Sequence, residues 1–153
     1  MRIKLVCVGR TKSEPLRILI EDYIQRLAKF VRCDVMEVRE GAAKSDDAIK
    51  EEEAERILSA LRPDATVVVL DLEGRQFSSH ELARQVEDWQ NVSVKEVMFV
   101  VGGHLGVTHA VRERAGLLWS LSRLTLTHEM ARLLLVEQLY RAYTITRGMP
   151  YQK

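Results

Sequence analysis

One apolar segment, residues 65–72, constrains the fold of this chain more than any other. It reads ATVVVLDL, a continuous run rich in β-branched side chains. Such a run is typical of a strand that is buried on both faces, as in a parallel sheet covered by helices. The rest of the chain therefore has to supply helices for both faces of a sheet.

The chain supplies that alternation. Strand-like runs are expected at residues 2–8, 34–38, 65–72, 95–101 and 120–127. Helical patterns follow them, starting near Ser13, Ser45, Ser78, Thr108 and Glu129, with Ser78 and Glu81 forming a capping-box pair. The repeated order predicts an α/β fold, with a mostly parallel sheet of five to six strands and helices on both faces. We expect one domain over residues 1–153.

Composition excludes several classes of protein. Lys and Arg number 23 against 22 Asp and Glu, so a nucleic-acid role would need a local basic patch or a partner. No apolar run reaches the roughly 18–20 residues that span a bilayer, and MRIKLVCVG resembles a first strand more than a signal peptide. Cys7 and Cys33 have no Cys or His at metal-ligand spacing. We expect reduced thiols, no metal, no membrane segment and a cytoplasmic location.

The candidate site lies between Met98 and His128. An apolar strand ends in the glycine-rich sequence GGHLG at 102–106, and the expected Ser/Thr-rich strand ends at His128. If these strands are adjacent, both loops lie at the edge where open α/β sheets bind ligands. Glycine lets backbone approach a ligand closely. A tight turn without a ligand explains the glycines equally well, and neither a dinucleotide fingerprint nor a phosphate loop is present.

The last helix, from about Glu129 to Thr146, is apolar on more than one face. This character predicts packing on the sheet with one face and on a second subunit with the other, with Leu135 and Leu139 as candidate dimer contacts. A core helix with peripheral charges is the alternative. The chain shows no nucleophile–base signature, which favours a group transfer that needs positioning and electrostatics.

Three segments carry a resemblance to a known family. GGHLG, SLSRLTLTH and LLLVEQLYRAYTITRGMPYQK resemble the RlmH family, also called YbeA-like, of small bacterial SPOUT-class methyltransferases. The resemblance implies methyl transfer from S-adenosylmethionine to N3 of a pseudouridine in 23S ribosomal RNA of the assembled ribosome. It also implies a homodimer and a trefoil knot near the carboxyl terminus.

By position, the resemblance implies a set of functional residues. The cofactor-binding residues would be Leu70, Gly102, Leu121, Ser122, Arg123, Leu124, Thr125 and Leu126. His128 and Tyr151 are candidate catalytic residues, and Arg141 and Lys153 are candidate substrate-binding residues. The family tail usually ends in Pro-Tyr-His and a basic residue, whereas this chain has Gln152 at the histidine position, so no role of that histidine transfers.

Two rival functions remain at this point. A non-catalytic ribosome-associated or nucleotide-binding α/β module would keep the sheet and the dimer helix, without needing small residues in both loops. A Rossmann-type dehydrogenase is disfavoured by the missing fingerprint.

Overall fold

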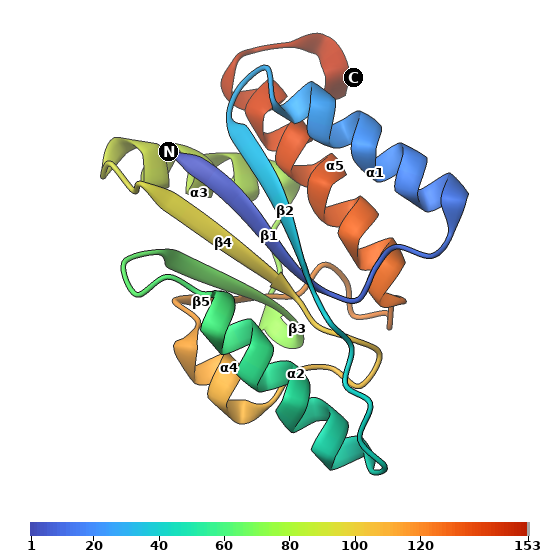
Figure 1. Cartoon of the computed structure of the whole chain (residues 1–153). Helices are drawn as coiled ribbons and strands as arrows, with labels where there is room; N and C mark the ends of the chain where they lie inside the picture. Colours follow the sequence, from blue (N-terminus) through green and yellow to red (C-terminus); the bar gives the residue numbers. More distant parts are fainter. Residues whose placement is uncertain (153) are drawn as a thin grey trace.

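A computed structural model describes residues 1–152 as one twisted sheet covered by helices on both faces (Figure 1). All five strands are parallel, in the order β2-β1-β4-β3-β5. They are β1 (Arg2–Val8), β2 (Arg32–Val38), β3 (Thr66–Arg75), β4 (Glu96–Val101) and β5 (Leu117–Trp119). The expected fold class is therefore confirmed.

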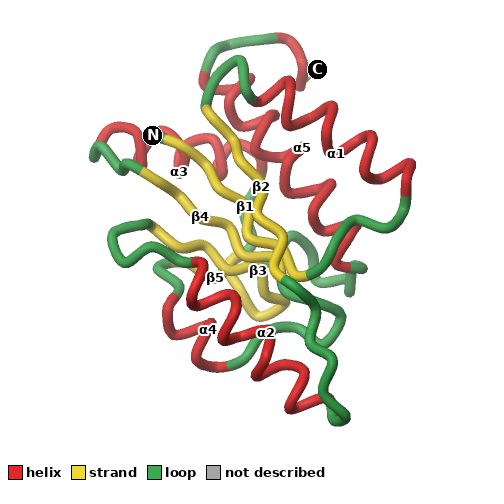
Figure 2. The backbone as a smooth tube through the Cα atoms, in the orientation of Figure 1, coloured by secondary structure: helices red, strands yellow, loops and turns green. Residues whose placement is uncertain are grey.

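The helices separate into two layers (Figures 1 and 2). One face carries α1 (Glu14–Leu27), α3 (Ser79–Asn91) and α5 (His128–Thr146). The other carries α2 (Asp46–Ala60) and α4 (His109–Arg114), and the short 3-10 helix η1 (Pro150–Gln152) follows α5. Successive side chains of β1 point to opposite faces of the sheet. Leu5 packs in the core under α1, α3 and α5, and Val6 packs in the core under α2 and α4. No helix among residues 1–152 is long and apolar enough to cross a membrane.

Hydroxyl side chains start the helices largely as expected. Ser78 and Glu81 form the predicted capping box, and Ser45 and Thr108 also cap their helices through the side chain. Ser13 differs, because its side chain caps nothing. Its backbone N–H instead donates to Oε1 of Glu129, 3.0 Å away, which joins the start of α1 to the start of α5.

The strand expected at residues 120–127 is absent, and this expectation was wrong. The fifth strand is β5, just before that segment, and residues 120–127 form a loop. The hydroxyls that gave the segment a strand-like alternation bond locally instead. Ser120 Oγ donates to the carbonyl of Ser122 at 2.9 Å, and Thr127 Oγ1 accepts from the N–H of Met130 to cap α5. β4 and β5 are also not adjacent, because β3 lies between them.

Much of helix α5 is buried within its own chain, while Leu134, Glu137 and Arg141 on it are only half-buried. It packs between α1 and α3 and against the sheet, and Leu135, Leu139, Ala142 and Tyr143 are fully buried there. The expectation that Leu135 and Leu139 contact a second subunit was therefore wrong. A helix with neighbours on two sides and a sheet beneath it needs apolar residues on most of its surface. The apolar character of α5 is therefore explained within a single chain.

Candidate functional site

A cavity of about 850 Å³ opens at the carboxyl ends of β3 and β4. Three segments line it, residues 70–73, 101–107 and 119–129 without Arg123, together with Arg112 and Ala131. The glycine loop and residues 120–127 lie together as expected, although residues 120–127 are a loop and not a strand, and β3 separates β4 from β5. All strands of the sheet are parallel, so each loop leaves the same edge whatever the strand order.

The glycine loop shows why small residues are needed on this wall. Gly106 has φ of +79°, in the region that favours glycine, and its N–H donates to the carbonyl of Gly103 at 3.0 Å. A Cβ on Gly102 would lie 2.8 Å from Cγ1 of Val107. The loop is thus a tight turn and, at the same time, a wall that presents bare backbone to the cavity.

The second loop, residues 120–127, provides the opposite wall. Leu121, Ser122, Leu124, Thr125 and Leu126 line the cavity. Ser122 stabilises the loop by accepting the N–H of Leu124 on its Oγ at 3.0 Å. Residues 120–127 belong to no strand, so most of their backbone N–H and C=O groups take no part in the hydrogen bonds of the sheet. These groups can bind a polar ligand without a phosphate-binding loop.

Leu70 and Gly102 also line the cavity, so seven of the eight proposed cofactor residues surround one space. Arg123 is the exception: it is exposed and does not line the cavity.

The sequence analysis missed an ion pair on the cavity wall. Arg112 of α4 donates from Nε to Oδ2 of Asp71 at 2.8 Å, and Oδ1 of Asp71 accepts the N–H of Glu73 at 2.9 Å. The Asp71 carboxylate is nearly buried, with a side-chain exposure of 6%. Its position directly after Leu70, at the end of an apolar strand, was a usable signal. The pair is neutral as a whole, and it ties α4 to β3 on the cavity wall.

His128 lies in the first turn of α5 and lines the same cavity. Burial, and next the charge of Arg132, lower its pKa from the usual 6.5. Arg132 is itself 3% exposed; it donates to the carbonyl of Val8 and, at 3.0 Å, to Oγ1 of Thr11. The imidazole of His128 is therefore neutral at pH 7 and able to accept a proton.

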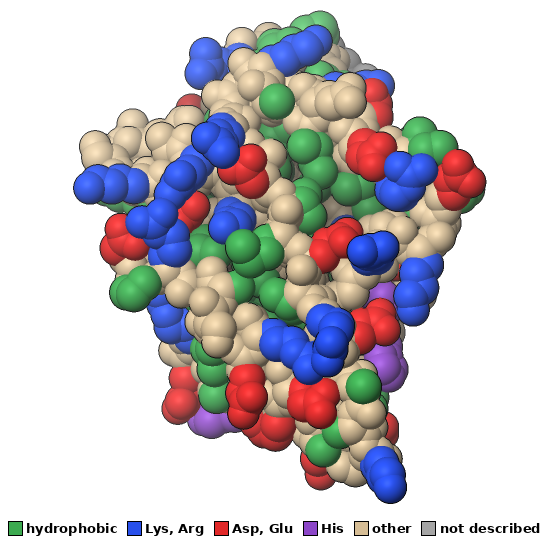
Figure 3. Space-filling view, viewed as in Figure 1, with side chains coloured by type: hydrophobic (Ala, Val, Ile, Leu, Met, Phe, Trp, Pro, Cys, Tyr) green, Lys and Arg blue, Asp and Glu red, His purple; other side chains and the backbone are tan. Residues whose placement is uncertain are grey.

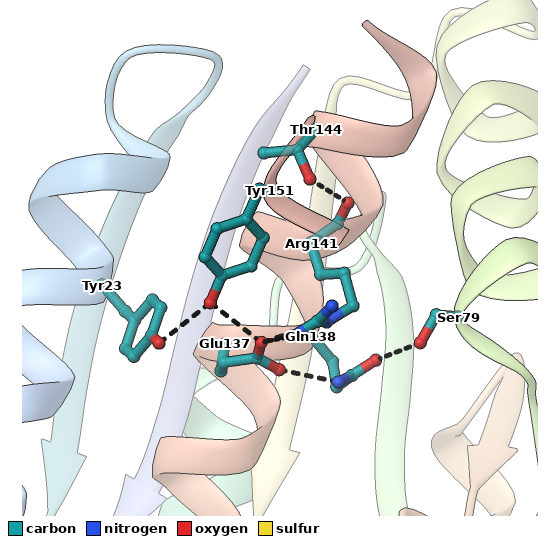
Figure 4. Close-up of polar contacts among 7 residues, drawn as sticks. All are labelled: Tyr23, Ser79, Glu137, Gln138, Arg141, Thr144 and Tyr151. Carbon is teal, nitrogen blue, oxygen red and sulfur yellow. Dashed lines mark hydrogen bonds and ion pairs between the residues drawn. The ribbon is translucent and has the colours of Figure 1, made fainter. Parts of the chain in front are cut away.

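Tyr151 and Arg141 lie elsewhere, on the outer side of α5 toward α1 (Figure 4). Tyr151 donates its hydroxyl proton to Oε1 of Glu137 at 3.1 Å, so the hydroxyl of Tyr23, 2.9 Å away, is the donor to Tyr151. Arg141 donates to the same carboxylate oxygen at 2.6 Å, and its guanidinium lies 4.9 Å from the centre of the Tyr151 ring. Burial and these bonds raise the pKa of Tyr151. Lys153 lies outside the described residues.

Among residues 1–152, no group of three or more His, Cys, Asp or Glu side chains is arranged to hold a metal ion. Burial raises the pKa of the Cys7 thiol to about 11, so this cysteine stays protonated in the core.

Comparisons with known proteins agree with this architecture. A family model described as "Predicted SPOUT methyltransferase" matches residues 1–152. The ribosomal RNA large subunit methyltransferase H of Gloeobacter violaceus is 45% identical over 152 residues, covering 99% of this chain and 98% of that protein. The protein of the same name from Geotalea daltonii is 40% identical over 151 residues, covering 99% of each. A solved structure, a probable methyltransferase from Bordetella pertussis Tohama I, shares the fold with a TM-score of 0.53 at 15% identity, over 92% of this chain and 95% of that one.

Proposed function

Because the chain belongs to the SPOUT methyltransferase family, we propose that it transfers a methyl group from S-adenosylmethionine to N3 of a pseudouridine in large-subunit ribosomal RNA of the assembled ribosome. One observation carries the cofactor site: the end of β3 and the two small-residue loops surround a single cavity. The names of the relatives, ribosomal RNA large subunit methyltransferase H, support the substrate class.

The cavity suits the proposed cofactor in size and chemistry. Its volume of about 850 Å³ falls within the usual range for small-molecule sites. Bare backbone at Gly102 and the 120–127 loop can hydrogen-bond adenine and the methionine part, while Leu70, Leu121 and Leu126 offer apolar contact. The Asp71–Arg112 pair adds one polar patch to this wall.

S-adenosylmethionine supplies a methyl group on a sulfonium sulfur, so the chain needs to add only positioning and proton handling. Transfer would break the methyl–sulfur bond and leave S-adenosylhomocysteine, and the N3 nitrogen of the base would give up its proton as it bonds to the methyl carbon. His128 is neutral and borders the cavity, so we propose that its imidazole accepts that proton. The loops on either side hold the reactants in line and exclude water.

We further propose a homodimer in which the tail of one subunit completes the site of the other. Tyr151 and Arg141 do not border the cavity of their own subunit. The Tyr23–Tyr151–Glu137 bonds hold this part of the tail against α5, so it is positioned as a fixed element (Figure 4). From there Tyr151, and Lys153 beyond it, would meet the target base and a phosphate of the RNA. The trefoil knot remains a prediction from the family resemblance, and a cytoplasmic location remains a prediction from the cysteines and composition.

Titration calorimetry and a transfer assay test the proposal together. S-adenosylmethionine should bind, NAD should not, and labelled methyl groups should appear on assembled ribosomal particles. A chain that binds S-adenosylmethionine but modifies no ribosomal RNA would favour the non-catalytic module instead. Binding of NAD alone would point to a dehydrogenase.

A further inference from the structure

A second concave surface lies at the opposite edge of the sheet, where the strands begin. It has a volume of about 470 Å³ and is lined by Met1, Arg2, Arg32, Arg62, Asp64, Lys95 and Glu96. We call Arg2, Arg32, Arg62 and Lys95 the amino-edge cluster. Figure 3 shows Lys and Arg side chains gathered over the amino ends of β1, β2 and β4. Four cationic side chains thus meet two carboxylates in a chain whose overall charge is only +1.

The strand register brings these charges together. Arg2 pairs in register with Arg32 on one side and with Glu96 on the other. Neighbouring strands lie about 4.8 Å apart, so Arg2 and Arg32 stand side by side at the start of the sheet. Each already has a carboxylate partner, Glu96 for Arg2 at 2.8 Å and Asp34 for Arg32 at 2.9 Å. With Arg62 and Lys95 beside them and Asp64 as a third carboxylate, the edge keeps a net positive charge, which favours an anionic partner.

Glu96 holds two of the guanidinium groups in place. It is 6% exposed, and its two carboxylate oxygens lie 2.8 Å from Nε of Arg2 and 3.6 Å from Nε of Arg62. Arg32 also makes its ion pair through Nε, which donates to Oδ2 of Asp34 at 2.9 Å. Within residues 1–152, the terminal Nη nitrogens of these three arginines donate no hydrogen bond. Each arginine keeps its paired outer donors free, the geometry that binds a phosphate in a bidentate manner.

We propose that the amino-edge cluster binds backbone phosphates of ribosomal RNA, as a second contact remote from the methyl-transfer site. The inference rests on the proposed function. An RNA partner fits better than a protein, because the centres of protein interfaces are depleted of charged residues and this surface is almost entirely charged. The seven residues of β1 put the cluster about 20 Å from the cavity, so it meets a different part of the RNA than the target base. Only a large, folded RNA particle reaches both places.

The test uses the Arg32→Gln/Lys95→Gln double variant, which leaves the Glu96 pairs intact. Ribosomal particles serve as the probe, in a methyl-transfer assay and in a binding titration across salt concentrations. The double variant should raise KM for particles at least about tenfold with kcat unchanged. The slope of log Kd against log salt should shrink by about 1.4–1.8, the amount expected for two lost phosphate contacts.

A matched control is Lys44→Gln/Arg84→Gln, which removes the same charge from exposed positions outside the cluster. The control should behave as wild type.

Both double variants should also bind S-adenosylmethionine normally and act equally on a hairpin too short to reach the cluster. If the cluster variant matches the control in KM and salt slope, the inference is wrong. If the variant changes the sedimentation coefficient instead, the cluster is a protein interface, which also overturns it. If wild type binds particles but transfers no methyl group, it is the proposed function that fails.

Discussion

Replacing Gly102 with alanine tests the glycine loop directly. The new Cβ would lie 2.8 Å from Cγ1 of Val107 and 3.3 Å from the carbonyl carbon and oxygen of Gly106. Carbon atoms normally pack about 3.5–4.0 Å apart. Val107 is 7% exposed and the cores around it are closely packed, so its side chain has little room to yield. Overpacking of this kind costs about 1–3 kcal/mol.

The cost must appear in one of two measurements. If the loop keeps its place, the fold carries the strain, and Tm should fall by about 2–4 °C per kcal/mol in a domain of this size. If the loop moves to relieve the strain, binding of S-adenosylmethionine has to bring the loop back to its original position. That costs the same free energy, so the Kd for S-adenosylmethionine should rise about 5- to 150-fold. Differential scanning calorimetry and titration calorimetry on one preparation measure both effects.

The chain offers a matched control and a rescue. A Cβ on Gly116 would meet nothing nearer than the carbonyl oxygen of Val67 at 3.7 Å, and Gly116 does not line the cavity. Gly116→Ala should therefore leave both measurements near wild type. Adding Val107→Ala to Gly102→Ala should recover part of the lost affinity. A Gly102→Ala protein with normal Tm and normal Kd would refute the reasoning.

Three further predictions concern the proton, the tail and the assembly. Because the pKa of His128 is lowered, its contribution to the free energy of unfolding should be present above pH 6.5 and lost as pH falls through the lowered pKa. The methyl-transfer rate should likewise fall on the acid side below pH 6.5, and this fall should disappear in His128→Asn. Deleting residues 151–153 should leave folding and most cofactor affinity intact while transfer to ribosomes falls at least about tenfold, or about 1.4 kcal/mol; wild-type turnover would falsify the tail proposal. Sedimentation at micromolar concentration should give twice the 17.5 kDa chain mass, and a clean monomer would exclude the dimer.

The sequence predicted the elements of the fold better than their arrangement. The run at 65–72 became β3, and the Ser78–Glu81 pair capped α3, because burial and capping are local properties of the chain. Residues 120–127 misled the prediction because their alternation matches a strand, while the hydroxyls bond within the loop.

Contacts between distant segments could not be predicted. Nothing in the sequence indicated that β3 would separate β4 from β5, or that Arg112 would meet Asp71 across 41 residues. The apolar surface of α5 was ambiguous for the same reason, since α1 and α3 can cover a helix as well as a second subunit can. The cavity was nevertheless anticipated at the correct edge, because all parallel strands end at that edge.

The central place of β1 has a consequence for synthesis and folding. This strand lies inside the sheet between β2 and β4, although β4 follows it by about 90 residues, and α5, later still in the chain, completes the core beside it. Translation at about 5–20 residues per second puts roughly 90 residues, or about 5–20 s, between the appearance of β1 and that of β4. During this interval one hydrogen-bonding edge of β1 has no partner, which favours aggregation and contact with chaperones. The sheet therefore depends on pairing between segments far apart in the chain, and folding should be slow for a domain of this size.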